Sequence, residues 1–136
     1  MQPTMTAQAA AQQADANARA AASVLPQAIL APFDSGQTPC DDPTDNGPKG
    51  RVTPYVSYEV RTRDHDQAFD LLLNWWTAND FVVLADLRPG KMYVWVENRA
   101  DGFRMAAKAN DLGKLYLISN APCVWPNGVP EPEADR

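Results

Sequence analysis

Residues 64–81, with the sequence DHDQAFDLLLNWWTANDF, carry the clearest helix signal in this chain. The large apolar residues at helical spacing in this stretch are Phe69, Leu72, Leu73 and Trp76. Residues spaced in this way lie on one face of an α-helix, so the helix is expected to pack that face against a sheet. Asp64 followed three residues later by Gln67 is the pattern of a capping box and predicts the start of the helix. Asn79 is expected to end it in the left-handed conformation.

Short segments with alternating apolar and polar residues follow this helix. They are Phe81–Asp86, Met92–Glu97, Phe103–Lys108 and Lys114–Ser119. Turn residues separate them, among which Asp101-Gly102 is a strong hairpin signal. Because connections this short force neighbouring strands to run antiparallel, the segments predict a four-stranded meander.

The chain before residue 64 is expected to add a helix, a loop and a strand. Residues 6–25 are dominated by Ala and Gln, which are strong helix formers, and predict a helix from Thr6 to Leu25. Its first half is expected to project into solvent or fray. We favour a spacer or docking helix, and the alternative is an Ala-lined helix for self-association. The segment from Phe33 to Gly50 is rich in Asp, Pro and Gly and is expected to be a loop. Residues Val52–Arg63 are expected to form a strand.

These elements predict an α+β fold, a two-layer sandwich in which an antiparallel sheet of about five strands packs against one helix. The Ala-rich N-terminal helix is added to it. A chain of 136 residues fits one domain with tails. We expect a helix or spacer at 1–25, the α+β domain at 26–126, and a Pro/Glu-rich, extended tail at 127–136.

The composition excludes some classes of function. The net charge is -5 and the pI is near 4.7, which argues against a general nucleic-acid binder, because neutralising phosphates needs a basic surface. The sequence has no apolar run of about 18 residues and no signal-peptide pattern. Met1 fits both a native start and the start of a chain whose export signal was removed.

Cys40 and Cys123 are the two cysteines of the chain. They are too far apart in sequence for a C-x-x-C redox or zinc motif. A disulfide between them would tether the long loop to the segment after the last strand, and structural disulfides persist in oxidising compartments. The alternative is two buried thiols in a cytoplasmic protein. We favour the disulfide and therefore an extracytoplasmic location.

Five side chains on the predicted meander form a candidate partner surface. They are Tyr93, Trp95, Arg104, Lys108 and Tyr116. Alternation along the strands places them on one sheet face. We favour the interpretation that the N-terminal helix covers part of this face. The alternative is an exposed surface for a protein or ligand partner, because aromatic residues and arginine are enriched at binding hot spots. Sheets of this kind also bind single-stranded RNA, but the acidity of the chain opposes that function.

No set of residues reaches the standard of a catalytic or metal site. His65 lies between Asp64 and Asp66 without a candidate nucleophile, and we expect an ordinary surface histidine. A partial calcium-loop pattern is formed by Asp42, Thr44, Asn46 and Gly47. Thr53 stands where that loop needs a bidentate glutamate. The sequence therefore predicts no cofactor and no metal.

Four motifs give the chain a resemblance to a known family. They are LNWWTANDF at 73–81, ADGF at 100–103, NDLGKL at 110–115 and APCVWPNG at 121–128. With an earlier cysteine near the position of Cys40, the chain resembles small lipoproteins of actinobacteria, a family of unknown function. It departs from them by carrying Ala121 where serine is common and by having no lipobox. The resemblance implies export and a lipid anchor absent from this chain, with the Ala-rich stretch nearest the membrane. It implies no reaction and no active-site residue.

The function expected from the sequence is a non-enzymatic extracytoplasmic binding domain, the soluble part of a lipid-anchored cell-envelope protein. Its partner would be a protein or an envelope component. The alternative is an inhibitor or immunity-type protein, such as a phage-borne superinfection-exclusion protein, which blocks a specific partner at the cell surface. An enzyme would need a pocket in which His65 meets ordered carboxylates.

Overall fold

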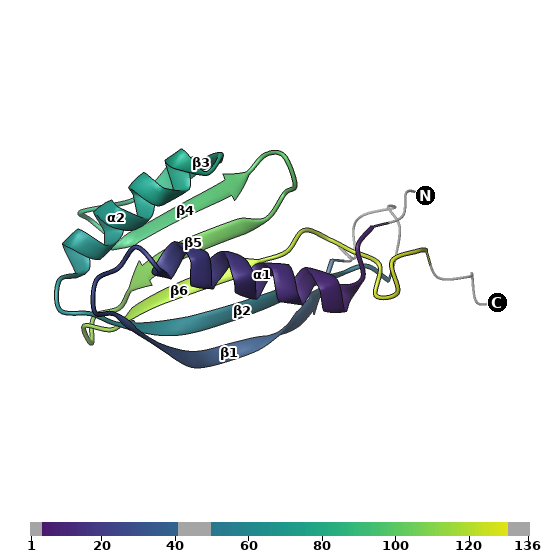
Figure 1. Cartoon of the computed structure of the whole chain (residues 1–136), viewed down its shortest axis with the longest axis horizontal. Helices are drawn as coiled ribbons and strands as arrows, with labels where there is room; N and C mark the ends of the chain where they lie inside the picture. Colours follow the sequence, from purple (N-terminus) through teal and green to yellow (C-terminus); the bar gives the residue numbers. More distant parts are fainter. Residues whose placement is uncertain (1–3, 41–49, 131–136) are drawn as a thin grey trace.

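The computed structural model describes residues 4–40 and 50–130. The fold is α+β, with two helices packed on a six-stranded antiparallel open sheet of order β1-β2-β6-β5-β4-β3. Both helices contribute to one core on the same side of the sheet (Figure 1). The elements in chain order are α1 (Ala7–Ala22), β1 (Ile29–Pro39), β2 (Val52–Arg61), α2 (His65–Ala78), β3 (Phe81–Asp86), β4 (Tyr93–Asn98), β5 (Arg104–Ala109) and β6 (Leu115–Asn120).

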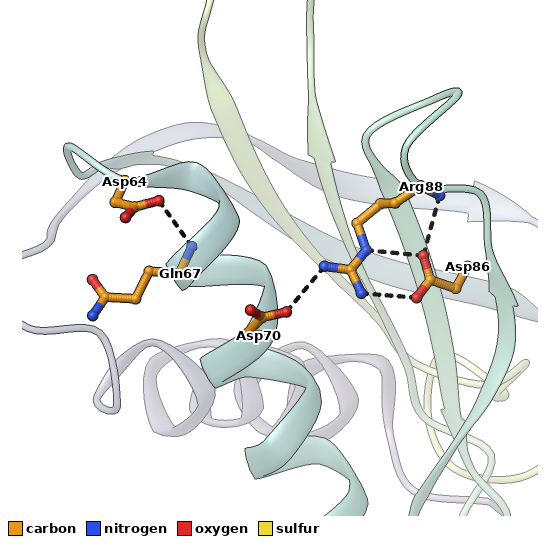
Figure 2. A network of polar contacts seen from close by, with 5 residues as sticks. All are labelled: Asp64, Gln67, Asp70, Asp86 and Arg88. Carbon is orange, nitrogen blue, oxygen red and sulfur yellow. Dashed lines mark hydrogen bonds and ion pairs between the residues drawn. The ribbon is translucent and has the colours of Figure 1, made fainter.

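Helix α2 begins where its sequence predicts. The Asp64 carboxylate accepts a hydrogen bond from the backbone N–H of Gln67 at 3.0 Å, which satisfies one of the free donors of the first turn (Figure 2). The end of the helix differs from the prediction. Asn79 has a φ of -118°, outside the left-handed region, and its side-chain amide donates to the Trp75 carbonyl at 2.8 Å. The left-handed residue is Asp80, with a φ of 69°.

The inner face of α2 forms the centre of the core. Its fully buried residues are Ala68, Phe69, Leu72 and Trp76, whereas Leu73 is half-buried. The Trp76 indole N–H points at the Met105 sulfur of β5, with 3.2 Å between the two atoms. The strands contribute Val94, Val96, Met105, Ala107, Leu115 and Leu117 to the same core. The predicted packing of this helix on a sheet is therefore confirmed.

Helix α1 packs along its length, contrary to the expectation of a solvated first half. Thr6 caps it by accepting a hydrogen bond from the N–H of Ala9 at 3.1 Å. The buried residues of the helix are Ala10, Ala14, Ala18, Ala21 and Ala22. The first two join Phe103, Ala121 and Val124 in a second core cluster. Since alanine side chains are short, the helix axis can lie close to the sheet, where it contacts β2 and β6.

Strand β1 corrects the predicted number of strands. Residues 33–39 were expected to be part of a loop, but they continue an antiparallel pairing with β2 that runs from Ile29 opposite Arg61 to Pro39 opposite Val52. A bulge at Phe33 interrupts the register. Strand pairing overrides the local Asp/Gly/Pro content, because β propensity depends strongly on context. The rest of the expected loop, and with it the partial calcium motif, lies outside the described residues.

The meander of β3 to β6 is confirmed, and β6 pairs onward with β2. Helix α2 carries the chain from β2, on one side of the sheet, to β3 at the opposite edge. Strand β6 therefore lies in the middle of the sheet although it comes last in the chain. The described residues beyond it are tied to the start of α1, where the Thr4 N–H donates to the Gly128 carbonyl at 2.9 Å. The C-terminal residues 131–136 of the expected tail lie outside the described part.

Cys40 and Cys123 form a disulfide, with 6.1 Å between their Cα atoms. The bridge connects the chain directly after β1 to the chain after β6, and these two strands are the neighbours of β2. Beside it, Val52 and Val124 exchange two backbone hydrogen bonds of 2.9 Å. The disulfide therefore closes one end of the sheet across β2.

Arg88, in the turn between β3 and β4, links α2 to the edge of the sheet. Its guanidinium contacts both oxygens of Asp86 at 2.9 Å and reaches Asp70 of α2 at 3.3 Å (Figure 2). It also lies over the Phe69 ring, 5.4 Å from the centroid. The hydrogen bonds from Arg88 lower the pKa of the Asp86 carboxyl. This network stabilises the contact between the helix and the β3–β4 turn.

Removal of this network is expected to change how stability depends on pH. Because the folded-state pKa of Asp86 is lowered, its contribution is complete above the unfolded value of about 3.9 and is lost as the pH falls through the folded value. Arg88→Met should cost about 1 kcal/mol of unfolding free energy at pH 7, since the ion pairs are partly exposed. This difference from the parent protein should shrink as the pH falls below the unfolded value and through the lowered folded-state pKa of Asp86.

Urea denaturation over a pH series measures that effect. Arg99→Met is the matched control, because Arg99 is an exposed cation that makes no ion pair with any residue in 4–40 or 50–130. It should leave the pH profile unchanged. A loss for Arg88→Met that is the same at pH 3 and pH 7 would show that packing of the arginine stem, not the charge, is what matters.

Candidate partner-binding surface

The two faces of the sheet differ in what covers them. Residues that point toward the helices are almost fully buried; they include Val94, Val96, Met105, Leu115 and Leu117. The residues that alternate with them point the other way, and this second set contains all the candidate residues: Tyr93, Trp95, Arg104, Lys108 and Tyr116. Helix α1 packs on the first face, so the expectation that it partly covers the candidate residues is wrong.

Strand register places the candidate residues in cross-strand rows. Tyr93 of β4, Lys108 of β5 and Tyr116 of β6 are direct neighbours, and Glu59 of β2 continues this row. A second row consists of Trp95, Ala106, Ile118 and Ser57, and a third of Glu97, Arg104, Asn120 and Tyr55. We refer to these three rows, together with Phe33, as the open face.

Phe33 and Tyr55 are members of the open face that the sequence did not reveal as candidates. The Phe33 ring lies 4.7 Å from the Tyr116 ring between centroids, and 63% of Phe33 is exposed. Phe33 occupies the β-bulge of β1, a segment expected to be a loop. The signal that could have revealed it is the apolar run that precedes Phe33, Ile29-Leu30-Ala31, but the Asp, Gly and Pro residues that follow favoured a loop.

Most charges on the open face are neutralised within it. Arg104 contacts Glu97 at 2.9 Å and lies 5.2 Å from the Trp95 ring centroid. Arg61, at the end of β2, lies 3.7 Å from Glu59. Lys108 differs, because its ammonium group has no ion pair or hydrogen bond with any other residue of the described chain. It is therefore an exposed cation between two half-buried tyrosines.

A second polar cluster lies on the helix side and fastens α1 to β2. The Tyr58 hydroxyl donates to the Asp15 carboxylate, and the Arg19 guanidinium contacts both groups, at 3.1 Å from the hydroxyl and 2.9 Å from the carboxylate. Burial and the bond to Asp15 raise the pKa of the Tyr58 phenol. Burial by itself raises the pKa of the Asp15 carboxyl, but the hydrogen bonds from Tyr58 and Arg19 outweigh it and lower this pKa. The phenol therefore keeps its proton, and the cluster is a structural contact.

An open groove runs beside this cluster between α1 and the β1–β2 hairpin. Ala11 and Asp15 form its helical wall, and residues 32–37 and 54–58 form the rest. Its only carboxylates are those of Asp15 and Asp34, and both are already hydrogen-bonded within the protein. Tyr58 donates to Asp15 and Tyr55 to Asp34, and the pKa of each phenol is raised, so both keep their protons. The groove therefore offers no activated nucleophile or base.

His65 lines a small surface pocket together with Arg63, Asp64 and Asp66. This is the kind of site that an enzyme would need. The Asp64 carboxylate, however, already accepts the capping hydrogen bond of α2. The His65 imidazole has no hydrogen-bond partner within the part of the chain that the structure describes. In the same residues, no three His, Cys, Asp or Glu side chains lie close enough to bind a metal ion. Thr62 also lines this pocket, and among the described residues no hydrogen bond joins its hydroxyl to the His65 imidazole.

No protein-family model, curated protein or solved structure matches this chain. Within residues 4–40 and 50–130, neither helix is long and apolar enough to cross a membrane. The disulfide indicates an oxidising, extracytoplasmic location.

Proposed function

We propose that this protein is a non-enzymatic binding domain that works outside the cytoplasm and contacts a protein partner through the open face. The observation that carries the proposal is the exposure of an aromatic and cationic cluster on the sheet face opposite both helices. Tyrosine, tryptophan and arginine supply much of the binding energy at protein interfaces. Rings held by strand backbones are also pre-ordered, which lowers the entropic cost of binding.

The sheet edges are less suited to binding than the face. Strand β1 contains Pro32 and Pro39, which have no N–H to donate, and the Ser35 N–H is occupied by the Asp34 carboxylate at 2.9 Å. Strand β3 is six residues long and contains a bulge. Prolines, bulges, charges and short strands all oppose the addition of another strand. We therefore place the partner on the face.

The proposed location is the cell envelope. The disulfide supports an oxidising compartment, and the resemblance to actinobacterial lipoproteins supports tethering through a lipid anchor. A partner that proved to be a toxin or phage protein would identify the immunity-type alternative instead, because the same face can serve either role.

Site-specific photo-crosslinking in the cell envelope tests this proposal. A photoreactive amino acid at Tyr116 or Tyr93 should give one discrete crosslinked protein product. The same group at Asn74, an exposed position on α2, should give none. Trp95→Ala should reduce the product at Tyr116 by about tenfold or more, as expected for loss of a hot-spot residue. Crosslinks from Asn74 but not from Tyr116 would place the partner on the helices and refute the proposal.

A further inference from the structure

Lys108 lies at a distinctive position on the open face. Its direct cross-strand neighbours are Tyr93 on one side and Tyr116 on the other. Both rings are half-buried, whereas Lys108 is exposed. The lysine stem can pack between the rings while the ammonium group stays at the surface. Within the described chain, no carboxylate or other acceptor contacts that ammonium group.

We infer that Lys108, flanked by Tyr93 and Tyr116, binds a carboxylate of an acidic side chain on the partner protein, next to an apolar or aromatic residue that contacts Trp95. This inference rests on the proposed function and specifies the chemistry of the partner. A carboxylate on the ammonium would form a charge-assisted hydrogen bond in a site partly shielded by rings. The neighbouring rings would cover the apolar part of the same segment.

Charge complementarity favours such a segment over a second copy of this chain. The carboxylates of the open face are already engaged, with Glu97 on Arg104 and Glu59 on Arg61. Asp34, at its border, accepts from Tyr55 at 3.2 Å. A symmetric contact between two open faces would therefore bury two lysines without available anions, which is unfavourable. The occupant should bring its own negative charge.

The same reasoning disfavours an extended polyanion, such as a nucleic acid. A polyanion gains affinity by being neutralised at many successive phosphates. The open face presents one unpaired cation, Lys108; its arginine, Arg104, is paired with Glu97, and Arg61 beside it lies near Glu59. One carboxylate matches this arrangement, whereas a run of phosphates does not.

Selection from a display library of random linear peptides against the intact, disulfide-bonded chain tests this inference. Selected peptides should share an Asp or Glu beside an aromatic or large aliphatic residue. Lys108→Met should weaken their Kd about tenfold, the loss expected for one charged hydrogen bond. Lys108→Arg should retain most of the affinity, and Arg99→Met, which removes one positive charge elsewhere, should have no effect. Binding should also weaken below pH of about 4, as the peptide carboxylate becomes protonated.

Other outcomes separate the failure of this inference from the failure of the proposed function. Peptides that need Trp95 but bind Lys108→Met equally well would overturn the carboxylate site and leave the open face as a binding surface. Peptides whose binding is unaffected by either Trp95→Ala or Lys108→Met would count against both the carboxylate site and the proposed function of the open face. A library that yields no peptide above background, or a dimer in sedimentation that Trp95→Ala dissociates, would also overturn the inference; the dimer would identify a second copy as the occupant.

Discussion

Replacement of Trp76 by alanine is expected to destabilise the domain by about 3–5 kcal/mol, the range for loss of a large buried aromatic side chain. Trp76 is 0% exposed and is the largest fully buried side chain of the described residues. It lies between α2 and the sheet, so its removal would leave a cavity where the two layers meet. It would also remove the contact of its indole N–H with the Met105 sulfur. Since domains of this size are stable by about 5–15 kcal/mol, this loss would remove a large share of the free energy of unfolding.

The adjacent residue provides the matched control. Trp75 is half-buried on the same helix, with its ring 6.1 Å from that of Phe81 between centroids. Trp75→Ala removes the same number of atoms but should lower the unfolding free energy clearly less. The reason is that water can fill the space left at a half-buried site, so no closed cavity forms. Urea denaturation followed by far-ultraviolet circular dichroism measures both. A near-neutral Trp76→Ala, or equal losses for the two variants, would show that the core does not depend on this face of α2.

Loss of the disulfide is the second large expected effect. The bridge joins residues 83 positions apart, and in the chain-entropy model a loop of that size contributes about 4–5 kcal/mol. Cys40→Ser and Cys123→Ser should each lower the unfolding free energy by about 2–5 kcal/mol, the range measured for native disulfides in small domains. The double variant should lose no more than either single one, because both substitutions break one bond.

Thermal unfolding with and without reductant measures this effect. Reductant should lower the Tm of the parent protein and leave that of the double variant unchanged. Additive losses from the two single substitutions would contradict a shared bond. Intact mass after alkylation under denaturing conditions gives an independent readout, since neither thiol should react until reductant is added.

Local sequence was sufficient for helix α2 and for the β3–β6 meander. The spacing of Phe69, Leu72 and Trp76 defines a buried stripe, and Asp64 supplies the cap at the expected position. Strand alternation likewise assigned Val94 and Val96 to one face and Tyr93 and Trp95 to the other. These features depend on neighbours within a few residues, so the pattern that encodes them is visible along the chain. The membership of the candidate surface follows from the same alternation.

Other features depended on residues far apart in sequence. Strand β1 forms because β2 is available to pair with it, and this pairing is what brings Phe33 to the open face. Alanine spacing in α1 did not specify which face of the sheet the helix would cover. The helix lies on the same face as α2 because Ala18 and Ala21 pack in the core that α2 fills, and because Asp15 contacts Tyr58.

The sequence by itself therefore determined the α+β class, helix α2, the meander and the alternation that groups Tyr93, Trp95 and Lys108. Only the tertiary structure decided that this group lies opposite both helices, that Lys108 is the cation left without an anion, and that a sixth strand exists. The physical reason is the range of the interactions. Periodicity and capping act within a few residues, whereas strand pairing, helix placement and charge pairing join residues that meet only when the chain is folded.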